Sequence, residues 1–180
     1  TMLNLEMAAT VEMTAIAERL RPNVITLVPE RREERTTEGG LDAVGQRSAI
    51  TPVIAMAKRS GIRVSLFIAA DPEQVRASAA LGVEQIELHT GDYCNCDGDA
   101  RKAELVKLAQ AATLGKSLGL EIAAGHGLTR DNVVDVVKIP EVTELNIGHA
   151  VIADAIAVGI KQAVLDFRAA INLGISQRVR

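Results

Sequence analysis

The sequence predicts an α/β fold, a TIM (β/α)8 barrel to which this chain supplies six βα units and lacks the first two. Short apolar runs alternate strictly with segments of helical period, which indicates βαβ units and a parallel sheet. Each unit takes about 30 residues, as in barrels of about 250 residues. Polar residues also end the strands all along the chain, as a shared barrel mouth requires. We therefore expect one incomplete barrel domain over residues 1–180.

The six expected strands are short apolar runs bounded by turn-forming residues. They are Leu3–Ala9, Val24–Val28, Val64–Ile68, Gln85–Gly91, Glu121–Leu128 and Glu144–Ala150. The third is apolar except for Ser65, which is typical of strands covered on both faces. A doubly wound open sheet is the alternative, but no Gly-x-Gly-x-x-Gly follows the first strand.

The expected helices follow the strands and carry recognisable ends. They cover residues 10–20, 48–60, 71–82, part of 97–119, the residues after Thr129 and about 152–173. Asp71-Pro72-Glu73 is a favoured helix start, and Gly61 and Gly82 are favoured stops. Pro52 is expected to be tolerated because it falls in a first turn.

One connection is too long for an ordinary link between a strand and a helix. Glu30–Gly40 is polar and ends in two glycines, so we expect a lid over the barrel mouth. Its arginines, Arg31, Arg32 and Arg35, are expected to be part of a solvated mixed-charge loop.

Composition excludes several classes of function. The net charge is -3 and aromatic residues make up 2%, which argues against a nucleic-acid partner. No apolar run approaches the roughly 20 residues of a membrane span, and no signal peptide is visible, so we expect a cytoplasmic protein. Cys94 and Cys96 lie one residue apart in an expected polar loop, and we interpret them as reduced thiols.

The last two strands both end in Gly-His. Gly125-His126-Gly127 and Gly148-His149 fall where barrels commonly hold phosphate, after the seventh and eighth strands. Backbone N–H groups at glycine turns and helix N-termini bind phosphate without net positive charge. The alternative is that the glycines only form turns and the histidines only pack.

Two carboxylates lie in otherwise apolar strands, where charge is costly unless it is used or paired. Glu6 and Glu87 are candidates for proton transfer, with barrel-interior salt bridges as the alternative. Glu87 and His89 are two residues apart and so share one face of their strand. No lysine lies in an expected strand, which argues against Schiff-base chemistry.

Several segments resemble pyridoxine 5'-phosphate synthase along the whole chain. They are Leu-Glu-Met-Ala-Ala-Thr from Leu5, Leu-Val-Pro-Glu-Arg-Arg-Glu-Glu-Arg-Thr-Thr-Glu-Gly-Gly-Leu-Asp from Leu27, Val-Ser-Leu-Phe-Ile from Val64, Ala-Gly-His-Gly-Leu from Ala124 and Glu-Leu-Asn-Ile-Gly-His-Ala from Glu144. The resemblance covers about the C-terminal three quarters of a family member, whose barrel would begin with two further βα units.

The resemblance implies a ring-closing condensation without metal or organic cofactor. In that family 3-amino-2-oxopropyl phosphate and 1-deoxy-D-xylulose 5-phosphate form pyridoxine 5'-phosphate, phosphate and water. By resemblance, Glu6 is a proton acceptor, His126 a proton donor and Glu87 a stabiliser of the transition state.

The same resemblance implies the groups that bind the two small phosphorylated substrates. Thr36 would contact the deoxyxylulose phosphate, and Gly127, Gly148 and His149 would hold the aminoketone phosphate. It also implies a homo-oligomer, an octamer in the family. The family's first two strands supply an Asn, an Asp-His pair, a catalytic His and a phosphate-binding Arg that this sequence does not contain.

Two other functions stay open at this point. A metal-dependent barrel enzyme could use His89, His126 and His149, because three histidines can hold zinc. A non-catalytic barrel fragment could instead bind phosphate esters without turning them over.

Overall fold

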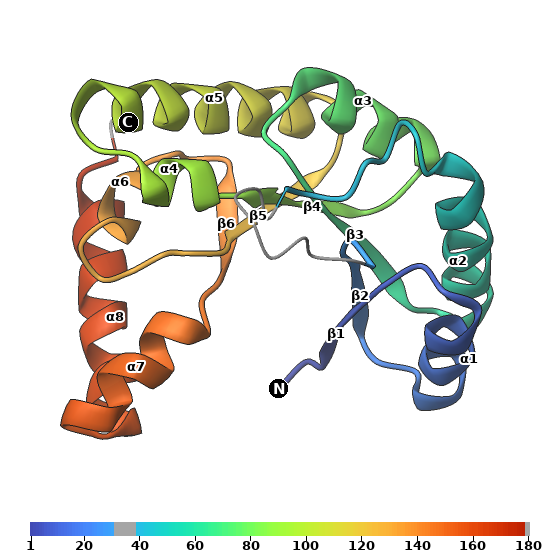
Figure 1. The fold of residues 1–180 in the computed structure, drawn as a ribbon, viewed down its shortest axis with the longest axis horizontal. Coiled ribbons are helices and arrows are strands. Elements are labelled where there is room, and N and C mark those ends of the chain that lie inside the picture. Colours follow the sequence, from blue (N-terminus) through green and yellow to red (C-terminus); the bar gives the residue numbers. More distant parts are fainter. Residues whose placement is uncertain (31–38, 179–180) are drawn as a thin grey trace.

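The computed structural model describes residues 1–30 and 39–178, which form a curled parallel sheet with helices outside it. Figure 1 shows the helices around the outside of the arc, with β1 and β6 on either side of its opening. The strand order in the described chain is β1-β2-β3-β4-β5-β6, all parallel. The order never reverses, so the sheet is a half-barrel consistent with a TIM-like barrel and differs from a doubly wound sheet.

Within these residues the strands are short and the helices vary widely in length. The strands are β1 (Asn4–Met7), β2 (Val24–Leu27), β3 (Arg63–Ile68), β4 (Gln85–His89), β5 (Glu121–Gly125) and β6 (Val142–Asn146). The helices are α1 (Val11–Leu20), α2 (Arg47–Ser60), α3 (Pro72–Leu81), α4 (Gly91–Asn95), α5 (Gly98–Ser117), α6 (Val133–Val136), α7 (His149–Val158) and α8 (Ile160–Ser176). No helix in this part of the chain is long and apolar enough to cross a membrane.

The convex face of the sheet contains most of the apolar core. Leu27, Leu66, Ile86 and Ile122 lie in register on four neighbouring strands, and each is fully buried. Burying one such side chain stabilises the fold by about 1.5–3 kcal/mol. This row anchors the strands against the outer helices and so fixes which residues face the other way.

The concave face is polar. Glu6, Thr26, Ser65 and Gln85 are register partners in one row across β1 to β4. Two residues further along β4, and therefore on the same face, lies Glu87. The alternation of side chains within each strand thus separates an apolar convex face from a concave face that carries polar and ionisable side chains.

Several helix ends confirm the sequence predictions. Asp71 caps α3 by accepting hydrogen bonds from the backbone N–H groups of Glu73 and Gln74. Gly61 and Gly82 end their helices in the left-handed conformation, with φ of 69° and 72°.

The reason given for tolerating Pro52 was wrong, because α2 begins at Arg47 and the proline lies beyond the first turn. Its exposed position leaves the carbonyl of Ser48 to solvent.

The other differences lie at strand ends. The segment after β4 is the short helix α4, which contains Cys94 and has Cys96 as its C-cap, where a polar loop was expected. β6 ends at Asn146, so His149 is the first residue of α7 and not part of a strand. The expected last helix is two helices, because Gly159 adopts φ 83° and ψ 150° between them. The expected lid and its three arginines fall on residues 31–38, outside the described residues.

Candidate active site

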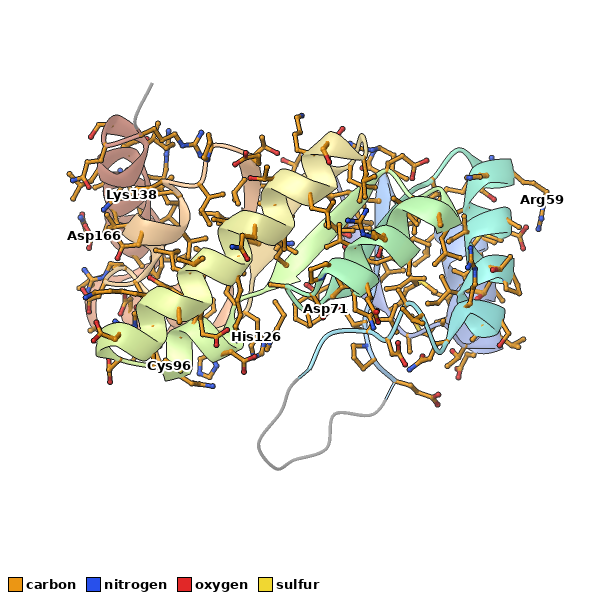
Figure 2. The ribbon with its side chains drawn as sticks, turned by 90° about the horizontal axis from the view of Figure 1, so that it is seen from above. Arg59, Asp71, Cys96, His126, Lys138 and Asp166 are labelled. Atoms are coloured by element: carbon orange, nitrogen blue, oxygen red, sulfur yellow. The ribbon has the colours of Figure 1, made fainter. Side chains whose placement is uncertain are left out.

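A cavity of about 970 Å³ lies on the concave side, at the C-terminal ends of the strands. The sequence-predicted residues Glu6, Glu87, His126, Gly127, Gly148 and His149 all line it. Figure 2 shows His126 on the same side of the molecule as Asp71 and Cys96, where strands end and helices α3 and α5 begin. Thr36 lies outside the described residues.

Glu87 is the most deeply placed acid of this cavity. Its residue is 4% exposed, and Asn146 of β6 donates a hydrogen bond from Nδ2 to Oε2 at 2.7 Å. Burial raises the pKa of Glu87 from 4.5 to about 7, while the hydrogen bond from Asn146 opposes that rise and the charge of Glu6 adds to it. A carboxyl group with this pKa exchanges its proton near neutral pH.

Within residues 1–30 and 39–178, no arginine forms the salt bridge to Glu87 that the alternative interpretation required. The neutral amide of Asn146 donates a hydrogen bond to it instead. An ion pair does exist on the concave face at the N-terminal ends of β3 and β5, where Arg63 contacts Glu121 at 2.7 Å. Beside it, Gln85 donates to Glu144 at 3.0 Å. These groups lie toward the N-terminal ends of the strands, where barrels place residues for stability.

His126 follows β5 directly, in an unusual backbone conformation. Its φ is 81°, and Gly127 continues the turn with φ of 78°. Gly125 before it has no room for a side chain, because a Cβ there would meet the carboxylate of Glu87 and the backbone of Asn146. The two flanking glycines are therefore required by close approach and by positive φ.

Hydrogen bonds from Thr90, the residue after β4, hold the turn at His126. The backbone N–H of Thr90 donates to the Gly125 carbonyl at 2.9 Å. The Thr90 hydroxyl lies 2.7 Å from that same carbonyl oxygen and 2.5 Å from the carbonyl oxygen of His126. The Cys94 thiol also approaches the His126 carbonyl, at 3.6 Å. These contacts connect the end of β4 and the start of α4 to the histidine turn.

An aromatic cluster lies beside the cavity. The ring of His89 is edge-on to Phe67 at 5.2 Å and lies 5.1 Å from the ring of His126, measured between centroids. Phe67 is also 6.3 Å from His126. His89 is mostly buried and lines a second, smaller cavity of about 340 Å³.

The three histidines do not form a metal site in the described chain. Among residues 1–30 and 39–178, no group of three or more His, Cys, Asp or Glu side chains is arranged to hold a metal ion. The expectation that His89, His126 and His149 could converge as zinc ligands was wrong, since His89 packs behind His126 and His149 begins a separate helix.

The start of α7 lines the same cavity. Gly148 is the N-cap, His149 is the first helical residue, and both line the cavity with Ala150. N–H groups in a first turn have no partner within the helix, and they point toward the N-terminal side. Gly127 lines the same cavity from the end of β5. Phosphate oxygens could thus be bound between two backbone segments.

Sequence reasoning missed Asn146, Thr90 and Phe67. Asn146 had a detectable signal, because it is a polar residue in the same strand segment as Gly148. Thr90 and Phe67 had none, since threonine and phenylalanine are common in strands for reasons of packing alone.

Comparison with known proteins gives consistent matches. The family model described as pyridoxal phosphate biosynthesis protein PdxJ matches residues 1–173. The pyridoxine 5'-phosphate synthase of Xanthobacter autotrophicus is 55% identical over 96% of this chain, which covers 68% of that protein. The protein of the same name from Zymomonas mobilis is 52% identical over 92% of the chain, which spans only 65% of its length.

A solved structure supports the fold at much lower sequence identity. The GMP reductase of Trypanosoma brucei in complex with guanosine 5'-triphosphate matches with a TM-score of 0.64 at 14% identity. The match covers 97% of this chain and 44% of that one.

Proposed function

The chain belongs to the family of the pyridoxal phosphate biosynthesis protein PdxJ, and we propose that it acts as a pyridoxine 5'-phosphate synthase. The reaction condenses 3-amino-2-oxopropyl phosphate with 1-deoxy-D-xylulose 5-phosphate to give pyridoxine 5'-phosphate, phosphate and water. The observation that carries this proposal is that one cavity is lined by Glu6, Glu87 and His126 together with the glycine turn after β5 and the start of α7. The proposal requires neither a metal nor an organic cofactor.

The chemistry needs protons moved in both directions, which suits this set of residues. Joining an amine to a ketone releases water, and ring closure also releases phosphate, so leaving groups must be protonated and carbon-bound protons removed. We assign proton acceptance to Glu6, proton donation to His126 and transition-state stabilisation to Glu87. The raised pKa of Glu87 and its hydrogen bond with Asn146 support this division of roles.

Both substrates carry phosphate, and we assign the aminoketone phosphate to Gly127, Gly148 and His149. The position of α7 supports this, because its first turn lines the cavity. Thr36 is proposed to contact the deoxyxylulose phosphate.

We further propose that two more βα units close this sheet into an eight-stranded barrel and that the closed barrel forms homo-oligomers. β1 and β6 are the two ends of the sheet in the described chain, and six strands fall short of the eight that a TIM-type barrel uses. The greater length of the two relatives supports the same proposal.

The decisive experiment is an assay of the gene product with both phosphorylated substrates, detecting pyridoxine 5'-phosphate directly. His126→Asn should lower kcat roughly 10²- to 10⁴-fold with a much smaller change in KM, since proton donation acts mainly in the transition state. Normal turnover in that variant would exclude the donor role. Tight binding of phosphate esters without product would instead support the non-catalytic alternative, and stoichiometric zinc would support a metal enzyme.

A further inference from the structure

His126 has a backbone conformation that residues with a side chain rarely adopt. In the described residues only Arg21 and His126 combine a side chain with positive φ. Arg21 ends helix α1, where a left-handed residue is common. His126 has no such explanation, and its φ of 81° needs surrounding contacts to maintain it.

The fully buried Thr90 provides such contacts from a different strand. Its hydroxyl has one proton and two carbonyl oxygens within reach, those of Gly125 at 2.7 Å and His126 at 2.5 Å. The Gly125 carbonyl already accepts the N–H of Thr90 at 2.9 Å. The hydroxyl proton is therefore best used on the carbonyl of His126, which the weakly donating thiol of Cys94 also approaches.

We propose that Thr90 is a positioning residue for His126, because its hydroxyl fixes the carbonyl of the left-handed turn and thereby the place of the imidazole in the cavity. The backbone at residue 126 determines where Cβ points, so a rotated peptide would move the ring. The effect of Thr90 on the position of the imidazole does not depend on what the protein does. Its effect on turnover rests on the proposed function.

The structural effect can be measured without turnover. The sequence has three histidines, so labelling histidine selectively gives three imidazole signals, of which His126→Asn removes one. Thr90→Val keeps the shape and removes the hydroxyl, and it should shift or split the His126 signal, whereas Thr90→Ser should preserve it. Thr26→Val is the matched control, since it removes another fully buried hydroxyl, one that donates to Asn4 at 3.0 Å, and should leave the signal in place.

If Thr90→Val does not fold, the pair Thr90→Ser and Thr90→Ala makes the same comparison, because the two variants differ only by the hydroxyl oxygen. An unchanged His126 signal in the folded variant without the hydroxyl would overturn the proposal.

The kinetic effect is tested by a double-mutant cycle in the gene product. Thr90→Val should lower kcat about tenfold to a hundredfold, as small misplacements of catalytic groups do, and Thr90→Ser should restore most of it. In the His126→Asn background the same change should cost little more, because the group it positions is already gone. A full additional loss in that background would show a merely structural role and would overturn the proposal. If the gene product makes no pyridoxine 5'-phosphate at all, the proposed function fails and the imidazole signals alone decide on Thr90.

Discussion

The carboxyl group of Glu87 lies where a negative charge is hard to maintain. It is buried, Glu6 is a like charge that raises its pKa, and among the described residues the amide of Asn146 favours its ionised form. A raised pKa of this kind is common for groups that must give up and regain a proton. The same burial has a consequence for stability that can be measured.

We predict that Glu87 makes the folded state less stable as the pH rises. Its pKa is about 7 when folded, against an ordinary value of 4.5, so between these two values the native state binds the extra proton. Stability from this group is complete below pH 4.5 and is lost as the pH rises through 7, by up to about 3 kcal/mol. Glu87→Gln, which cannot ionise, should gain relative to wild type between pH 5 and pH 8. Urea unfolding at both values tests this, and a constant difference between the two proteins would contradict it.

Asn146 should control where this titration falls. Its hydrogen bond at 2.7 Å favours the charged carboxylate, so Asn146→Ala should raise the pKa of Glu87 further. The limb of the pH–rate profile that Glu87→Gln abolishes should then move to higher pH in Asn146→Ala. Asn132→Ala offers a comparison, since Asn132 is a buried amide that contacts the turn after His126 and not Glu87. A profile in Asn146→Ala that keeps its wild-type position would remove Asn146 from this role.

At the scale of single residues, sequence reasoning found the groups that are out of place in their surroundings. Glu6 and Glu87 are carboxylates in apolar strands, and His126 lies between two glycines. Thr90 and Asn146 are ordinary polar residues whose roles depend on contacts across 36 and 59 positions of the chain. Such long-range contacts leave no local pattern.

At the scale of elements, predictions succeeded where a local signal marks an end. The Asp71 cap and the glycine stops at Gly61 and Gly82 have the expected geometry. The short helix α4 was missed, because it has five residues and gains its stability from packing rather than from helical propensity. The break at Gly159 was missed for a related reason, since a glycine within an apolar run can also continue a helix.

Gly61, the left-handed residue that ends α2, allows a direct test of whether a local signal ends a helix. Gly61→Ala should destabilise the fold by roughly 1–2 kcal/mol, because φ is 69° there and a Cβ is strained even though no atom lies within 4 Å of it. Gly61→Asn should cost clearly less, since asparagine tolerates this conformation better. Urea unfolding of both variants measures the difference. Equal stability of the alanine variant and the wild type would show that α2 ends without help from its glycine.

At the scale of the whole molecule, the parallel sheet with its strands in sequence order could be predicted, because it depends on counting and order. Strict alternation gave the parallel sheet, and polar strand ends gave the shared mouth. The apolar surface of the last helices could not be predicted, since helical spacing does not say which faces find a partner. Within the described chain Ile152, Ile156 and Ile160 are 60%, 86% and 56% exposed. Large exposed apolar surfaces of this kind mark interaction sites or a tendency to aggregate.

We therefore expect the 180-residue chain, when produced alone, to self-associate and to have far less synthase activity than the gene product. β1 and β6 end the described sheet with backbone groups that could pair with another strand, and unpaired edges promote association. Glu6 is also exposed on the edge strand, although a proton acceptor works best when water is excluded. Sedimentation of a sample whose intact mass matches 180 residues, followed by an assay with both substrates, tests the two parts together. A monomeric sample with full activity would show that six strands suffice and would overturn the proposed eight-stranded closure.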